Sequence, residues 1–261
     1  MCDTCGCNLT DGNRHLAEQA NVHGHTVIDV LSDLMSANDR QAEHNRGHLE
    51  THGVFAVNLM SSPGAGKTAL LEATIAALAP EFRIAVIEGD LETENDAARI
   101  RRQGVPAVQI TTGSACHLDA FLVHNAMHQL DLDAIDLLFI ENVGNLVCPA
   151  SFDLGQHRNV ALLSVTEGDD KPAKYPVMFR AADAVVISKV DLLELIDDFD
   201  PDTAARYVRE LGRDVPLLRT AARKKRALDS WLAWLRHEIT DYREHRAHFK
   251  PVTINATSIR I

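Results

Sequence analysis

The sequence predicts an α/β fold in which a largely parallel β-sheet carries helices on both faces. Short, continuous apolar runs recur along the chain, and helical patterns separate most of them. Strands that are buried on both faces read as such continuous runs, and helical connections between them make neighbouring strands parallel. A glycine-rich phosphate-binding sequence follows the first run. We therefore expect a doubly covered sheet with a nucleotide at its edge.

The expected elements follow in chain order. Residues 1–36 form an N-terminal extension with cysteines and histidines, residues 37–248 form the main domain, and residues 249–261 form a tail. The main domain begins with a polar helix over about 36–52, which Gly53 ends. The predicted strands cover 54–60, 83–88, 107–111, 137–141, 160–165, 184–188 and 216–220. The predicted helices cover 69–78, 94–103, 117–129, 203–211 and 228–242.

Length and charge exclude several classes of protein. With 261 residues, one large domain with an appendage is expected. The formal net charge of −11 disfavours binding to nucleic acid, and the single basic run at 223–226 is expected to be solvated surface. No apolar run approaches the roughly 18 to 20 residues of a membrane span, and the N-terminus lacks the features of a secretory signal. We expect a cytoplasmic protein.

A phosphate-binding loop follows the first predicted strand. The letters SSPGAGKT at 61–68 lead directly into an apolar helical pattern, which is the context that a P-loop requires. Small residues let successive N–H groups wrap the phosphates, Lys67 pairs with the β and γ oxygens, and the Thr68 hydroxyl holds Mg²⁺. Ser61 stands where the usual pattern has glycine. The predicted contacts of this P-loop NTPase are Pro63, Gly64, Ala65, Gly66, Lys67, Thr68 and Ala69.

Two acids at strand ends are candidates for the Mg²⁺ side of the site, and with Lys67 and Thr68 they form the predicted catalytic set. Glu141 ends an apolar run, and Gly144 follows it at the spacing of a GTPase switch. Asp90 ends the second strand region and serves either as a Mg²⁺ ligand or as a helix cap. Asn145 stands where many signalling GTPases carry a water-orienting glutamine, so slow intrinsic hydrolysis is expected.

Base preference is readable further along the chain. The letters SKVD, from Ser188 to Asp191, resemble the Asn-Lys-x-Asp guanine motif with serine at its first position. The Asp191 carboxylate can accept the N1 and N2 protons of guanine, which adenine does not offer, and the Lys189 stem can lie over the base. GTP and GDP are therefore favoured, although a strand that ends in a helix cap would look similar. Thr220 and Ala221 are further candidates for backbone contacts to the base.

Three thiols are crowded into the extension. Cys2, Cys5 and Cys7 flank Gly6, which lowers the cost of the sharp turn that chelation needs. Thiolates suit a borderline metal such as Ni²⁺ or Zn²⁺. Thiols without a bound metal are the alternative interpretation.

A second set of candidate ligands lies in the main domain. Cys116 and His117 are expected at a helix N-terminus, where the helix dipole favours a thiolate. Cys148 lies four residues beyond Gly144, so a metal bound there would sense the nucleotide. Three ligands leave a position open or completed by a second subunit. Ordinary core packing is the alternative for isolated cysteines.

Histidines are a further feature. Six of them precede the P-loop: His15, His23, His25, His44, His48 and His52. We expect most to be solvated, with weak metal binding at His23 and His25. His124 and His128 are spaced to chelate on one helix face but are expected to face water.

The combination resembles the HypB family, the GTPases of nickel insertion into NiFe hydrogenase. The resemblance rests on the CxxCGC terminus, on EHNRG at 43–47, on the P-loop region, on ENVGNLVCP at 141–149, and on TEGDDKP and KYP within 166–176. It implies a tight nickel site at the first three cysteines, as in some members. It also implies a nickel or zinc site at Cys116, His117 and Cys148 in a GTP-dependent dimer interface. The implied partners are a HypA-type nickel and zinc protein and the hydrogenase large-subunit precursor.

The implied function is that of a GTP-hydrolysing nickel metallochaperone. One alternative is a nickel or zinc storage protein with a vestigial nucleotide site. Another is a GTPase that serves a different nickel enzyme, such as urease, or a cobalamin enzyme, although the cysteine terminus speaks against it. Ser188 and the basic residues at 223–226, where the family often has glycines, depart from the family pattern.

Overall fold

The structure, a computed structural model, describes residues 27–90, 95–113 and 115–248. The predicted ligands Cys2, Cys5 and Cys7, the histidines of the extension and the predicted tail lie outside the described residues. Within the described ranges, no helix combines the length and the apolar character needed to cross a lipid bilayer.

The core is a seven-stranded sheet with the order β3-β2-β4-β1-β5-β6-β7, and every paired strand is parallel to its neighbour. The predicted fold class and the predicted strands are confirmed, with bounds that differ by at most two residues. The strands are β1 (Phe55–Ser61), β2 (Ile84–Asp90), β3 (Ala107–Thr111), β4 (Leu137–Glu141), β5 (Arg158–Ser164), β6 (Ala184–Ser188) and β7 (Leu217–Thr220).

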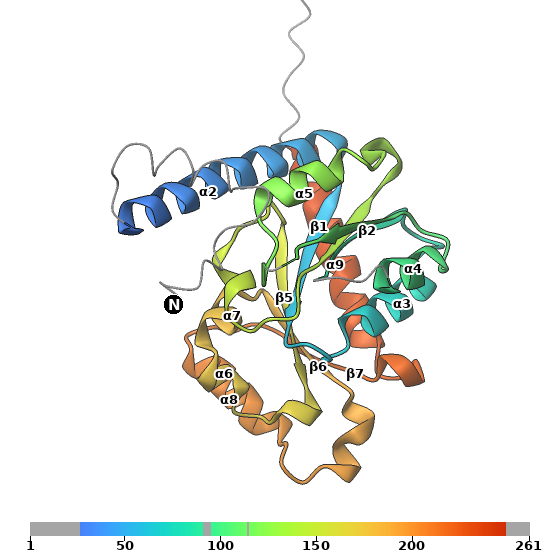
Figure 1. Ribbon diagram of the computed structural model, residues 1–261. Coiled ribbons are helices and arrows are strands. Elements are labelled where there is room, and N and C mark those ends of the chain that lie inside the picture. The colour runs from blue at the N-terminus through green and yellow to red at the C-terminus, as the bar shows by residue number, and fades with distance from the viewer. Residues whose placement is uncertain (1–26, 91–94, 114, 249–261) are drawn as a thin grey trace, which may run out of the picture.

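Helices cover both faces of the sheet (Figure 1). They are α2 (Val27–His52), α3 (Lys67–Leu78), α4 (Asn95–Arg101), α5 (Ala120–Met127), α6 (Lys171–Lys174), α7 (Pro176–Ala181), α8 (Pro201–Glu210) and α9 (Asp229–His248). On one face, Val57 of β1 shares a core with α3, α4 and α9, including Trp231. On the other face, Ala56 packs with α2 and α5, and Met60 packs with α7 and α8. Alternate residues of one strand therefore supply two opposite cores.

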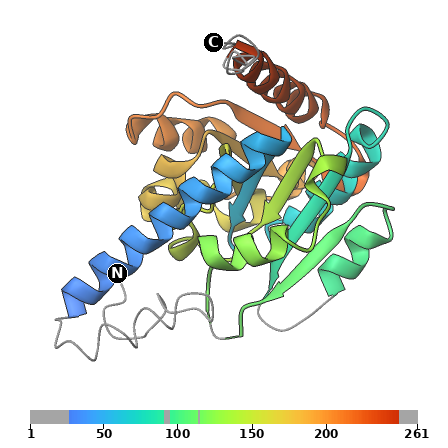
Figure 2. The same cartoon turned by 90° about the horizontal axis from the view of Figure 1, so that it is seen from above.

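Helix α2 is an integral part of the domain. Asn38 donates a hydrogen bond to the Asp153 carbonyl at 2.8 Å. The Asn45 amide donates to the carbonyls of Ala120 at 2.7 Å and Leu154 at 3.0 Å, and Asn45 is fully buried. Figure 2 shows α2 and α5 side by side on this face of the sheet. These buried amides fix α2 against α5 because an unpaired amide there would be costly.

Three expectations about helices are corrected. The first helix begins at Val27 and not near residue 36, so the apolar stretch at 27–31 continues its pattern instead of belonging to the extension. Helix α5 begins at Ala120, because the Asp119 carboxylate accepts the Leu122 N–H at 2.8 Å and caps it. Cys116 and His117 thus precede α5 and do not lie in its first turn. The short helices α6 and α7 have no counterpart among the predictions.

His157 links strand pairing to pH. The Ala56 N–H donates to Nδ1 of His157 at 3.0 Å, so this nitrogen carries a lone pair and the ring is neutral. Burial, aided by the charges of Arg46 and Arg158, lowers the pKa of His157 to about 4. Protonation would break a backbone contact of β1.

We expect stability to fall as the pH drops from about 6.5 to about 4, because in that window the unfolded chain binds a proton on this histidine and the folded chain does not. Above a pH of about 6.5, the contribution of neutral His157 to the free energy of unfolding is fully present. The midpoint of urea unfolding, measured at several pH values in this range, gives the slope of stability against pH. His157→Gln should lose part of it, whereas His237→Gln, at an exposed position on α9, should keep it. An unchanged slope in His157→Gln would contradict the assignment.

Candidate functional site

A cavity of about 660 Å³ opens at the carboxyl edge of the sheet, where the P-loop, the end of β4 and the ends of β6 and β7 converge. This is the edge at which parallel α/β sheets bind ligands, and the volume suits a nucleotide-sized molecule. The structure brings together the predicted residues Pro63, Gly64, Ala65, Gly66, Lys67, Thr68, Ala69, Asp90, Glu141, Ser188, Lys189, Asp191 and Thr220 as lining. Ala221 is absent from the lining, whereas its neighbour Ala222 belongs to it.

The P-loop has the backbone that its sequence predicts. Gly64 and Gly66 adopt positive φ angles of 74° and 103°, which glycine tolerates best, and Gly66 caps α3. The buried Lys67 amine donates to the Ser61 hydroxyl at 3.0 Å. The serine at the first position of the motif therefore holds the lysine that is suited to pair with phosphate oxygens.

A pair of buried carboxyl groups lies beside the P-loop. The Thr68 hydroxyl donates to Glu141 at 2.9 Å, and Glu141 stands opposite Glu88 in the register of β4 and β2. Burial raises the pKa of both groups, and for Glu88 the Glu141 charge raises the pKa further. Each has an Oε2 atom that is buried without a hydrogen-bond partner among the described residues. A divalent cation would satisfy both oxygens, so the residues fit Mg²⁺.

Glu88 was missed by the sequence reasoning, which selected Asp90 from the same stretch. Asp90 is the last residue of β2, is half-buried and also lines the cavity. The sequence feature that identifies Glu88 is its position as an acid inside an otherwise apolar strand. A carboxylate is seldom buried there unless it has a partner or a ligand. Asp96 and Arg99 of α4 also line the cavity and were not predicted.

The opposite end of the cavity is tied to the P-loop. The Ser188 hydroxyl donates to the Ala65 carbonyl at 2.6 Å, and the Lys189 amine donates to the Gly64 carbonyl at 2.8 Å. The serine that departs from the guanine motif thus anchors this strand end to the phosphate loop. Arg223 and Lys224, expected as ordinary surface, are exposed and line the cavity as well.

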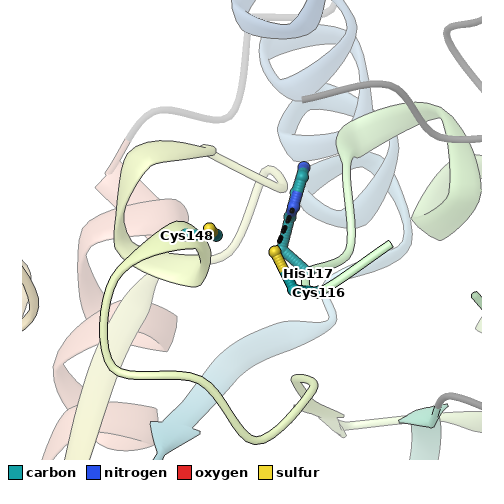
Figure 3. Close-up of side chains that lie close together, drawn as sticks. All are labelled: Cys116, His117 and Cys148. Carbon is teal, nitrogen blue, oxygen red and sulfur yellow. Dashed lines mark hydrogen bonds between the residues drawn. The ribbon is translucent and has the colours of Figure 1, made fainter. Parts of the chain in front are cut away.

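Three candidate metal ligands meet beside this cavity. The ligand atoms of Cys116, His117 and Cys148 all lie within 4.8 Å of one another. Figure 3 shows Cys116 and His117 on one segment and Cys148 on another. His117 is fully buried and stacks on Phe152 at 4.0 Å between ring centroids. Burial lowers the pKa of His117 to about 4, so its imidazole is neutral at physiological pH and suited to ligate a metal. Its Nε2 has no partner among the described residues.

The residues after Glu141 connect the two regions. The side-chain amide oxygen of Asn142 accepts the backbone N–H of Leu118, the residue after His117, at 3.1 Å. Gly144 lies so close to the P-loop that an added Cβ would be 2.8 Å from the Pro63 Cα.

The side chain of Asn145 has a local structural role. Its oxygen accepts the N–H groups of Val147 at 2.7 Å and Cys148 at 3.2 Å. It therefore shapes the turn that carries Cys148, a use different from the water-orienting one considered for this position.

Comparison with known proteins identifies the lineage. A sequence model described as the nucleotide-binding domain of CobW/HypB/UreG matches residues 55–218. Over 212 residues the chain is 51% identical to the hydrogenase maturation factor HypB of Azotobacter vinelandii, covering 81% of this chain and 70% of that relative. This chain belongs to the HypB family. The resemblance found in the sequence is thereby confirmed.

Two further relatives of HypB type support the assignment. The crystal structure of HypB from Helicobacter pylori in complex with nickel has a TM-score of 0.75 at 41% identity, covering 78% of this chain and 96% of that one. A hydrogenase/urease maturation factor HypB of Helicobacter hepaticus is 45% identical over 205 residues, covering 77% of this chain and 84% of the relative. The HypB fold is thus shared over 78% of this chain.

We expect Gly144→Ala to lower nucleotide affinity at least tenfold, because the new Cβ would collide with the Pro63 backbone and displace the P-loop. Titration with a fluorescent GDP analogue measures this. Gly47→Ala is the matched control, since an added Cβ there meets nothing within 4 Å. It should leave affinity unchanged and stabilise α2 by about 0.5 to 1 kcal/mol. Equal affinity in both variants would contradict the close approach.

Proposed function

We propose that this protein is a GTP-hydrolysing nickel metallochaperone that delivers nickel to the hydrogenase large-subunit precursor during maturation. Membership of the HypB family supports the hydrogenase assignment. The observation that carries the proposal is the short segment from Glu141 to Cys148, which contacts the P-loop at one end and presents a thiol at the other.

The nucleotide is handled by residues of the cavity. The Lys67 amine, now on Ser61, pairs with phosphate oxygens when GTP enters. Thr68, Asp90 and Glu141, together with Glu88 beside Glu141, would hold Mg²⁺, which would neutralise charge on the β and γ phosphates. Asp191 accepts the guanine N–H groups. The absence of a glutamine after Gly144 is consistent with slow intrinsic hydrolysis.

Nickel is the cargo. Two thiolates and a neutral imidazole suit Ni²⁺ or Zn²⁺, and three donors leave a position for a second protomer or an acceptor. Val147, next to Cys148, is an exposed apolar side chain at 43% and offers a contact for such a partner. GTP binding orders this segment and closes a homodimer. A HypA-type accessory protein and the large-subunit precursor are the further partners.

A second candidate role is service to urease, alone or in addition. It is favoured by the name of the relative from Helicobacter hepaticus, which includes both enzymes. Deletion that abolishes hydrogenase activity and leaves urease activity intact would exclude it. Nickel storage remains the alternative of another class.

The test combines nickel stoichiometry with dimer mass, measured by equilibrium titration and light scattering. Each is recorded without nucleotide, with GDP and with a non-hydrolysable GTP analogue. We expect the analogue to drive dimerisation and to change a nickel site that Cys148→Ala removes. Lys67→Ala should abolish GTP hydrolysis because it deletes the phosphate-pairing amine. Identical nickel binding in all three states, or normal hydrolysis in Lys67→Ala, would overturn the proposal.

Loss of the turn at Cys148 should weaken nickel binding without removing a ligand. Asn145→Ala deletes the acceptor of two N–H groups, and loss of such a capping side chain costs about 1 kcal/mol in total, so we expect roughly fivefold lower affinity. Asn145→Asp keeps an acceptor and should bind nickel nearly as the wild type does. Chelator competition measures both. Equal losses in the two variants would show that the turn is not what matters.

A further inference from the structure

Five histidines gather where α2 meets α5, the two helices that lie side by side in Figure 2. The sequence predicts that most of them face water, although the spacing of His124 and His128 would also allow chelation on one helix face. In the structure they form one group, made of His44, His48, His52, His124 and His128. The first three recur every fourth residue on α2 and therefore share one helix face, and His124 in α5 is four residues from His128, the residue that caps the end of that helix.

Two of these rings are already at ligating distance from each other. Nε2 of His128 donates a hydrogen bond to Nε2 of His124 at 3.1 Å, and a metal ion would replace the shared proton. Nitrogens that bind one ion at about 2.1 Å with tetrahedral or square-planar angles lie about 3.0 to 3.4 Å apart. The pair therefore has the separation of two neighbouring ligands.

The tautomer of His124 is set by a buried amide. Asn45 uses its NH₂ group on the carbonyls of Ala120 and Leu154, so its oxygen is an acceptor. Nδ1 of His124 lies 3.1 Å from that oxygen and must donate to it. When His124 is neutral, its free lone pair is therefore on Nε2, the nitrogen that lies 3.1 Å from Nε2 of His128. In metal sites, the hydrogen bond made by the ring nitrogen that does not bind the metal orients the ligating histidine.

Further imidazoles lie close enough to complete a ligand set. The ring centroid of His48 is 5.6 Å from that of His128, and its Nδ1 is buried without a partner among the described residues. The ring centroid of His44 is 5.1 Å from that of His124. His52 is already engaged by Asp133 at 2.7 Å. His44 and His128 are exposed, so an ion can reach the group from solvent.

We propose that α2 and α5 form a second metal site, which binds one divalent ion of the Zn²⁺ or Ni²⁺ type through Nε2 of His124 and His128, with His48 and His44 completing the set by side-chain rotation. Imidazole nitrogen suits these borderline ions. The site contains no thiol, so it differs in donor chemistry from the cluster of Cys116, His117 and Cys148. It needs no nucleotide and is independent of the proposed function.

The test uses the full, untagged chain with all five cysteines replaced by serine, titrated with Zn²⁺ alone and with Ni²⁺ alone. We expect one ion per chain to remain bound. His124→Ala and His128→Ala in this background should each weaken it at least tenfold. The matched control replaces His237 and His245 of α9 by alanine and should change nothing. Absence of a bound ion, or equal loss in the control, would overturn the proposal.

A second measurement covers the case in which the cysteine-free chain does not fold. Nitrogen NMR of the histidine rings in the wild-type protein reports metal ligation directly. We expect the Nε2 signals of His124 and His128 to shift on addition of Zn²⁺ beyond the thiol equivalents, while the His237 signals stay in place. Unmoved signals for both residues of α5 would refute the site.

Discussion

One buried amide, Asn142, connects the nucleotide cavity to the candidate metal ligands. It follows Glu141 directly, and its oxygen accepts the N–H groups of Val143 at 3.0 Å and Leu118 at 3.1 Å. Its NH₂ group donates to Asn58 in the middle of the sheet at 3.3 Å. A buried amide with three hydrogen bonds is costly to displace because each broken bond leaves an unpaired polar group. Asn142 therefore holds the end of β4 against the segment that carries His117.

The protonation of the buried carboxyl groups in the cavity depends on whether a cation is bound beside them. Glu88 and Glu141 share a buried position, and their raised pKa values mean that the pair retains a proton when no cation compensates it. A bound cation reverses this preference, because it favours both carboxylates. Ligands that bind only the folded state also stabilise it. A cation bound to this carboxyl pair would therefore stabilise the carboxyl edge of the sheet.

The sequence alone predicts those features that depend on a pattern of neighbouring residues. Strands buried on both faces read as apolar runs, and the P-loop is recognisable because its chemistry fixes residue types at fixed spacing. Contacts between distant segments were not readable. Glu88 gains its meaning only opposite Glu141, Asn145 only through the turn at Cys148, and His124 only beside α2. The start of α5 was misplaced because the Asp119 cap competed with an apparently continuous helical pattern.

The hydrogen bonds from Ser188 and Lys189 to the P-loop carbonyls tie the end of β6 to the P-loop. Such preorganisation reduces the conformational entropy that a ligand must remove on docking. A ligand that reaches both the P-loop and the end of β6 then meets groups whose positions are already fixed relative to each other. The part of its binding energy that would otherwise be spent on arranging these two segments is saved.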